Sequence, residues 1–247
     1  NGRSVAERFI TRKVGWQMEL KKITSRVFYY PHQPETDRPM LAYLNGDKIA
    51  LAIDAGNSAD HVDEFYKSLE IEDLKKPDFT VITHWHWDHT FGMHKIHGLS
   101  IAHHKTNEFL KQERAKLSDS AYIKFLINDD ECLAREYVDN KRIIAVLSDI
   151  QFEKELTLNL GGITAMIFHT VSPHSEDTVL IYIPEEKILF LGDSTSEDFY
   201  NDGYMDKEKL MSLTNLIESF DCKYCILSHA EPLTKSDLLD YLKSILK

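Results

Sequence analysis

Four ligand-type side chains crowd residues 83–89, which read T-H-W-H-W-D-H. His84 and His86 are two positions apart, so an extended segment would project both to one side, where they could bind one divalent ion. Asp88 and His89 come where the chain begins to coil, and they could point towards a second ion. Four such residues within six positions are hard to explain as surface or core histidines. The stretch therefore predicts a metal site at a strand-to-helix turn.

The pattern H-x-H-x-D-H after a strand resembles the signature of the metallo-β-lactamase superfamily. The resemblance implies an α+β fold, a four-layer αββα sandwich with one or two metal ions at the sheet edges. It covers the chain from about residue 41 to the C-terminus. We therefore expect residues 18–247 to form one metallo-β-lactamase-like domain and residues 1–17 to be an N-terminal extension or leader.

Three later residues match the remaining ligand positions of the superfamily. His174 lies in a loop similar to the family's P-G-H-T loop, although Pro173 stands where the family usually has glycine. Asp193 ends an apolar strand and looks like the carboxylate that bridges two ions. His229 ends the last predicted strand and matches the final ligand, with Ala230 in place of the usual glycine.

The resemblance implies two divalent ions, with zinc expected and iron or manganese as alternatives, because mixed imidazole and carboxylate ligands suit these metals. Two ions can lower the pKa of a shared water enough to supply hydroxide at neutral pH. Asp88 would also be catalytic, orienting the nucleophile or moving a proton. Asp54, at the end of an earlier strand, is expected to support the ligands, with a turn residue as the alternative. The first ion would be bound by His84, His86 and His174, the second by Asp88, His89 and His229, and Asp193 would lie between them.

These features predict a hydrolase that uses a metal-bridging hydroxide on a small ester, thioester, lactone or phosphoester. The commonest zinc β-lactamases have Cys at the Asp193 position and Lys three residues later, where this chain has Ser196. The quorum-quenching lactonases have Tyr at that later position, a role that Tyr122 or Tyr200 could take. A single-iron persulfide dioxygenase of the same fold is the alternative function. The candidate substrate-binding residues are His169, Tyr122, Ser196 and Tyr200.

The composition of the chain limits the classes of substrate and the compartment that we expect. The chain has 247 residues, of which 43% are hydrophobic, enough for a substantial core. It carries 29 basic and 40 acidic residues, a formal charge of -11, which argues against a nucleic-acid substrate. No run is long enough for a membrane span. Three cysteines, Cys132, Cys222 and Cys225, do not suggest a disulfide framework. We therefore expect a cytoplasmic enzyme with a small-molecule substrate. The sequence does not decide between a monomer and a homodimer.

Periodicity and turn signals predict the elements that position these residues. A hairpin is expected at Asn45-Gly46, because both residues tolerate positive φ, and another at Gly161-Gly162. Residues 104–138 have a helical composition and lengthen the spacing between His89 and His174, so they predict an inserted helical pair. That insertion could cap the active site or only cover the sheet. Strands are expected at residues 21–30, 40–44, 48–53, 78–83, 99–102, 151–160, 163–168, 178–183, 187–193 and 223–229, and helices at 59–69, 90–96, 207–220 and 234–247.

Overall fold

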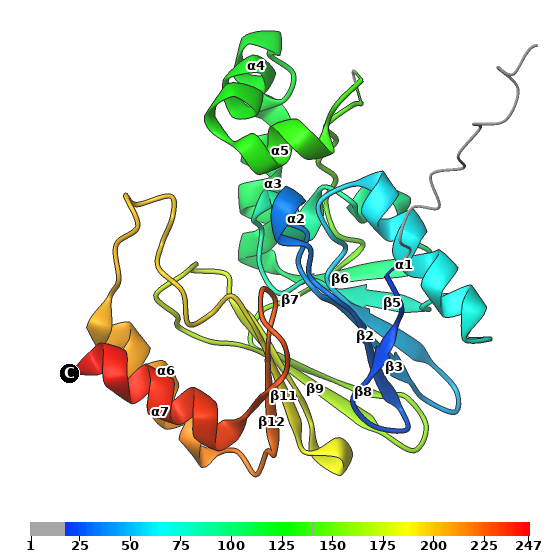
Figure 1. Ribbon diagram of the computed structural model, residues 1–247, viewed down its shortest axis with the longest axis vertical. Coiled ribbons are helices and arrows are strands. Elements are labelled where there is room, and N and C mark those ends of the chain that lie inside the picture. The colour runs from blue at the N-terminus through cyan, green and yellow to red at the C-terminus, as the bar shows by residue number, and fades with distance from the viewer. Residues whose placement is uncertain (1–17, 140) are drawn as a thin grey trace, which may run out of the picture.

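Two β-sheets pack face to face in the computed structural model, with helices on both outer faces (Figure 1). The structure describes residues 18–139 and 141–247, so the extension predicted for residues 1–17 lies outside the described residues. The layers confirm the predicted α+β, four-layer αββα sandwich. The described helices are α1 (Ala59–Ile71), α2 (Trp87–Thr90), α3 (His104–Lys116), α4 (Ser120–Asp129), α5 (Glu131–Glu136), α6 (Lys207–Ser219) and α7 (Lys235–Leu246), with 3-10 turns η2 (Pro34–Thr36), η3 (Met93–Lys95) and η4 (Pro184–Glu186).

The first sheet has the strand order β1-β2-β3-β4-β5-β6-β7. Its first four strands are antiparallel, and Asn45 and Ala50 pair beside the predicted hairpin turn. From β4 to β7 the strands are parallel, so their carboxyl ends meet at one edge of the sheet. Asp54 and Thr83 follow β4 and β5 at that edge. The strands are β1 (Lys21–Lys22), β2 (Val27–Tyr30), β3 (Leu41–Asn45), β4 (Ala50–Ile53), β5 (Phe79–Val81), β6 (Leu99–His103) and β7 (Ile150–Phe152).

The second sheet has the strand order β13-β12-β11-β10-β9-β8. Strands β11 and β12 are parallel, and their carboxyl ends therefore deliver Asp193 and His229 to one edge. The other neighbours are antiparallel, including the hairpin predicted at Gly161-Gly162. The strands are β8 (Glu155–Asn159), β9 (Thr164–His169), β10 (Val179–Ile183), β11 (Ile188–Gly192), β12 (Tyr224–Leu227) and β13 (Leu233–Thr234).

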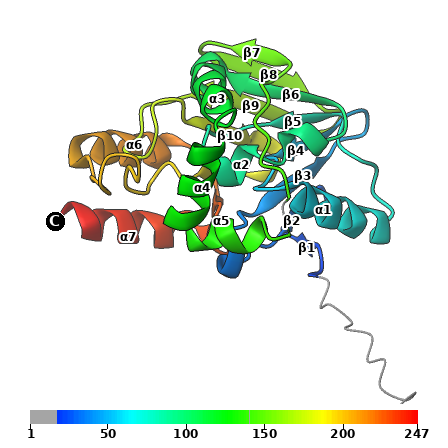
Figure 2. The same cartoon turned by 90° about the horizontal axis from the view of Figure 1, so that it is seen from above.

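Apolar side chains fill the space between the sheets and the space under each outer helix. Leu51, Ile181 and Phe190 belong to the cluster between the sheets. Helix α1 buries Phe65 against the outer face of the first sheet, while α6 and α7 cover the second sheet around Leu213 (Figures 1 and 2). Burial of each such side chain stabilises the fold by roughly 1.5–3 kcal/mol. The core thus holds the two site-bearing sheet edges in fixed register.

Four predictions about elements are wrong in detail. The strand expected at residues 21–30 is two antiparallel strands, β1 and β2, separated by residues 23–26. The strand expected at residues 151–160 is two strands, β7 and β8, which belong to different sheets. The helix expected at residues 90–96 is a short α2 that begins at Trp87, followed by η3. The predicted helical pair at residues 104–138 is three helices, because Asp119 and Asp130 each cap a new helix by accepting backbone N–H bonds.

The structure shows the length of the helices and the surroundings of two of the cysteines. Within the described residues, every helix is too short or too polar to cross a lipid bilayer. Cys222 and Cys225 are buried and unbridged, with their Sγ atoms 3.8 Å apart, and both pack in the cluster beneath α6 and α7. Their surroundings are those of structural core residues.

Candidate metal centre

The seven predicted ligands converge from both sheets on one end of the sandwich. His84 and His86 follow β5, and Asp88 and His89 lie in α2, which begins directly afterwards. The other three come from the second sheet. Gly192 (φ +57) ends β11 against Thr83, and a Cβ there would lie 3.0 Å from the Thr83 side chain. The absence of that Cβ lets the two sheet edges approach closely. The arrangement gives two groups: His84, His86 and His174, and Asp88, His89, Asp193 and His229.

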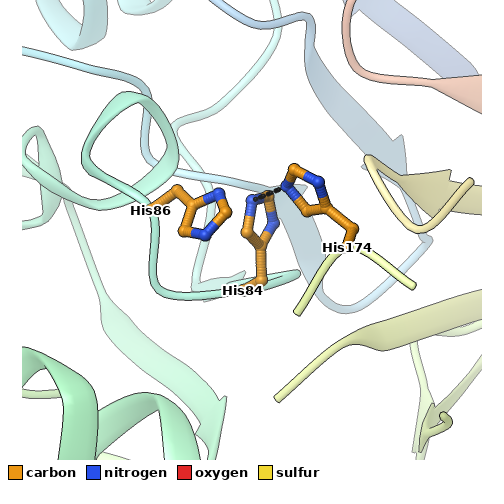
Figure 3. A group of neighbouring side chains, drawn as sticks. All are labelled: His84, His86 and His174. Atoms are coloured by element: carbon orange, nitrogen blue, oxygen red, sulfur yellow. Dashed lines mark hydrogen bonds between the residues drawn. The ribbon is translucent and has the colours of Figure 1, made fainter. Parts of the chain in front are cut away.

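The first group consists of three buried imidazoles. Their candidate ligand atoms lie within 4.8 Å of one another, and the rings meet at centroid distances of 4.5–4.8 Å. Figure 3 shows the rings converging, with the Nε2 atoms of His84 and His174 facing each other at 3.2 Å. Burial first, and then the neighbouring histidines, lower the pKa of His84 well below its usual value and that of His86 to about 3. These two rings are therefore neutral at pH 7, with lone pairs to offer.

Hydrogen bonds fix which ring nitrogens carry protons. His174 Nδ1 lies 2.7 Å from the Glu197 carbonyl oxygen and must donate to it. Thr83 Oγ1 donates to Asp54 at 2.9 Å, so it accepts from His84 Nδ1 at 3.0 Å. His84 Nε2 therefore presents a lone pair to His174 Nε2, and a His174 Nε2 without a proton would present one in return. Two facing lone pairs repel unless a cation lies between them, and nitrogens bound to one tetrahedral zinc ion stand about 3.3 Å apart. The donor set fits such an ion.

The second group alternates imidazoles with carboxylates. Asp88 Oδ2 lies 2.9 Å from His89 Nε2 and 3.1 Å from His229 Nε2. Asp193 Oδ2 lies 3.2 and 3.3 Å from the same two nitrogens. It also lies 3.9 Å from His174 Nε2, which places this carboxylate between the two groups. Imidazole and carboxylate ligands in this proportion suit a divalent ion of the zinc, iron or manganese kind.

Charges in the second group stabilise one another. Burial lowers the pKa of His89, but Asp88, Asp54 and Asp193 outweigh it and raise that pKa well above the usual value. Burial likewise raises the pKa of Asp193, but His229 and His89 outweigh it and hold the pKa well below the ordinary range. The carboxylates of Asp88 and Asp193 therefore stay ionised at pH 7. A bound cation would take the place of the imidazole protons. Donors and charge therefore both fit a cation.

Asp54 supports this arrangement without belonging to either group. It follows β4 with a left-handed backbone (φ 64), and its Oδ1 accepts from the Thr83 backbone N at 2.8 Å. Its Oδ2 lies 2.9 Å from His89 Nδ1, which leaves His89 Nε2 facing the centre. Such contacts orient metal-binding imidazoles. Asp54 therefore lies where it can orient the ligand histidines, as expected from the sequence.

The four candidate substrate-binding residues lie at different distances from the centre. Tyr200 is adjacent, with its ring centroid 4.7 Å from that of His86. Ser196 lies in the turn after Asp193, and its backbone N donates to the backbone carbonyl oxygen of Asp193 at 2.9 Å. Tyr122, in α4, donates to Glu113 in α3. His169 stacks on His103 and bonds to the Glu176 carbonyl, and it belongs to neither group.

The sequence did not identify Asp37 and Trp85 as neighbours of the centre. Asp37 Oδ1 lies 3.5 Å from His229 Nδ1, and burial together with Asp88 raises the pKa of Asp37 to about 6. Trp85 packs against His86 with ring centroids 5.1 Å apart. Trp85 stands between His84 and His86 in the sequence, and that position could have marked it as a neighbour of the centre. No local pattern marks Asp37.

Comparisons with known proteins agree with this geometry. The family model of the metallo-beta-lactamase superfamily matches residues 40–229. A metallo-beta-lactamase from Pontibacter korlensis has a similar structure, with a TM-score of 0.67, 19% identity and coverage of 92% of this chain and 98% of the other. An archaeal superfamily protein from Sulfolobus tokodaii gives a TM-score of 0.60 at 22% identity, covering 90% and 86%.

A larger enzyme is also similar in part. A double mutant of the sec-alkyl sulfatase PisA1 gives a TM-score of 0.69 at 16% identity, covering 92% of this chain but 40% of the sulfatase. At these sequence identities, the similarity to the solved structures shows a shared fold but not a shared reaction. No curated protein matches the sequence.

Proposed function

The chain belongs to the metallo-beta-lactamase superfamily, and from this membership we propose that it is a metal-dependent hydrolase of a small ester, thioester, lactone or phosphoester. The observation that carries the proposal is the position of Asp193. Its Oδ2 is 3.2 Å from His89 Nε2 and 3.9 Å from His174 Nε2, so one carboxylate adjoins both ligand groups. A carboxylate shared between two ligand groups can hold two cations close together, as a two-ion hydrolytic centre needs. The names of the metallo-beta-lactamase and the sulfatase that the fold resembles support hydrolysis as the reaction class.

Two divalent ions, which we propose to be zinc, would supply hydroxide at neutral pH by lowering the pKa of a shared water and would polarise the attacked oxygen. The residues of the chain have separate roles. His84, His86 and His174 would hold one ion, and Asp88, His89 and His229 the other, beside Asp193.

Asp88 is the proposed catalytic residue. Burial opposes its ionisation, but His89 and His229 lower its pKa below the ordinary value, so Asp88 is a carboxylate at pH 7. Its Oδ2 contacts the two imidazoles, which leaves the other oxygen to accept a hydrogen bond from an attacking water. Asp88 would thereby orient the water towards a carbonyl or phosphorus centre.

We also propose that the substrate is a small molecule that the enzyme meets in the cytoplasm. The net charge of -11 supports the exclusion of nucleic acid. The unbridged Cys222 and Cys225 support a reducing compartment.

The test is a panel of esters, thioesters, lactones and phosphoesters given to the zinc-loaded protein. Turnover of at least one class is expected, and His86→Ala should reduce it on the order of 100-fold or more, because a metal ligand is lost. His97→Ala is the matched control, since His97 is exposed and bonds to the Pro77 carbonyl. Unchanged turnover in His86→Ala would refute the assignment. Oxygen-dependent turnover of a persulfide by protein with one iron per chain would instead favour the dioxygenase.

A further inference from the structure

Aromatic side chains from three separate segments meet beside His86. Trp85 precedes it, Phe109 comes from α3, and Tyr200 comes from the loop between β11 and α6. The ring centroids of Trp85 lie 5.4 Å from Phe109 and 4.7 Å from Tyr200, and Tyr200 lies 4.7 Å from His86. These spacings are those of attractive aromatic pairs. Together with Phe199, whose ring lies 5.7 Å edge-on from His174, they form what we call the aromatic wall.

The aromatic wall is open to solvent on the loop side. Phe199 is 66% exposed and Tyr200 59% exposed, although both adjoin a buried centre. In the described part of the chain, no hydrogen bond joins the Tyr200 hydroxyl to another residue. Large apolar surfaces left in water next to a reactive site are typical of a subsite for an apolar group.

The loop presents these two rings on a defined support. Asp198 and Tyr204 form a bridge, with the Asp198 backbone N donating to the Tyr204 oxygen at 3.0 Å. Phe199 and Tyr200 directly follow Asp198 in this turn. At its base, the Glu197 carbonyl accepts from His174 Nδ1 at 2.7 Å, so the turn is tied to the first ligand group. The loop and helices α3–α5 rise at the same end of the sandwich (Figures 1 and 2).

The charges beside the aromatic wall are mainly negative. Glu197 and Asp198 directly precede Phe199 in the loop. On the α3 side, Glu113 is buried and accepts from Tyr122 at 2.8 Å, with Lys116 3.3 Å away as a partial counter-charge. A negatively charged group entering this region would meet like charges as it lost water. A neutral group would not.

We propose that the aromatic wall binds the apolar acyl portion of a neutral carboxylic ester, thioester or lactone, and that Tyr200 determines its preference for longer chains. This inference rests on the proposed hydrolysis. The wall begins at His86 and His174, so a carbonyl placed at the first ligand group would have its acyl chain alongside the rings. Burial of several methylene groups there would favour long neutral acyl groups over short or anionic ones.

Turnover of a graded series tests the proposal. We expect the zinc-loaded protein to prefer 4-nitrophenyl octanoate to the acetate, and 4-nitrophenyl butanoate to the hemisuccinate of matched length. Tyr200→Ala should lower the octanoate-to-acetate ratio of kcat/KM about tenfold, whereas Tyr200→Phe should retain most of it. Tyr241→Ala is the control, because Tyr241 is 57% exposed on the outer helix α7. Turnover with no dependence on chain length, or an unchanged ratio in Tyr200→Ala, would overturn the inference.

A binding measurement separates failure of the inference from failure of the proposed function. The probe is 2-octanone, a neutral ketone that cannot be hydrolysed, with quenching of tryptophan fluorescence as the signal and acetone as the control for collisional quenching. Saturable quenching that Trp85→Phe removes and Tyr200→Ala weakens would support the subsite even if no ester were hydrolysed. Equal quenching by 2-octanone in wild type and in both variants would overturn it.

Discussion

Asp54 Oδ2 lies 2.9 Å from His89 Nδ1, and both side chains are buried where β4 and α2 meet the centre. The same carboxylate accepts from the Thr83 hydroxyl, which in turn accepts from His84 Nδ1. One acidic residue outside the two ligand groups therefore sets the ring orientation of a histidine in each of them. The position depends on the left-handed backbone of Asp54, which turns its side chain back towards the end of β5.

Replacement of Asp54 should weaken metal binding without removing a ligand. For Asp54→Ala we expect a loss of roughly 10- to 100-fold in zinc affinity, because the ring of His89 loses the acceptor that fixes its tautomer. Asp54→Asn should lose less, since the amide oxygen can still accept one bond. Competition with a chromophoric chelator measures the affinity. Asp47→Ala, which removes an exposed partner of Arg26, should bind zinc as the wild type does, and equal affinity in Asp54→Ala would contradict the role.

A buried ion pair fastens the end of helix α5 to the sandwich. Arg38 donates to both carboxylate oxygens of Glu136, at 2.9 and 3.0 Å, and Glu136 is 3% exposed. Ser58, the N-cap of α1, also donates to Glu136. For Glu136→Ala we expect the free energy of unfolding to fall by about 3 kcal/mol, because Arg38 is left buried with Glu64 as its remaining carboxylate partner.

Urea unfolding measures this loss. The double variant Arg38→Met, Glu136→Leu should recover much of it, because both charges are removed together. Glu131→Ala is the matched control, since its pair with Arg135 is exposed and should contribute less than about 1 kcal/mol. Equal stabilities of Glu131→Ala and Glu136→Ala would contradict the account.

His103 should make stability depend on pH. Burial, and then His169, lower its pKa to about 4. The other neighbours are His104, Lys105 and the Glu153 carbonyl, to which His103 Nε2 donates at 2.8 Å. Between about pH 6.5 and pH 4 the unfolded chain binds a proton that the folded one does not, so the free energy of unfolding must fall as the pH falls.

His103→Gln keeps a donor for the Glu153 carbonyl but removes the titration. We expect the variant to lose less unfolding free energy than the wild type between pH 7 and pH 4.5, as measured by urea titration at each pH. Other buried histidines titrate in both proteins, so the difference between them is the informative quantity. Parallel pH profiles would show that His103 is not involved.

The sequence predicted those parts of the site whose information is local. His84, His86, Asp88 and His89 lie within six residues, so strand and helix periodicity sufficed to aim them at one place. The hairpin at Asn45-Gly46 was located correctly but for the wrong reason. Asn45 pairs with Ala50, residues 46–49 form the loop, and neither Asn45 nor Gly46 has a positive φ. Glycine is required at position 46 because a Cβ there would lie 2.2 Å from the Leu160 carbonyl oxygen. Residues from the second sheet needed the family resemblance, since no local rule brings Asp193 to His89 across 104 positions.

Other features depended on long-range packing and were missed. Strands β7 and β8 read as one run because both alternate, yet β7 pairs with β6 and β8 with β9, a choice that depends on which sheet has a free edge. Trp85, Phe109 and Phe199 looked like ordinary apolar residues. Phe109 meets Trp85, and Phe199 meets His174, only because α3 and the loop after β11 lie beside the centre.

The central claim is that seven side chains hold two divalent ions. Its most direct test is elemental analysis of the purified full chain, stripped with a chelator, reloaded with zinc and freed of excess metal. We predict two zinc ions per chain, about one in a variant carrying both Asp88→Ala and His229→Ala, and about one in His84→Ala, His86→Ala. A wild-type protein that retains no zinc, or a single ion that neither double variant removes, would contradict the account.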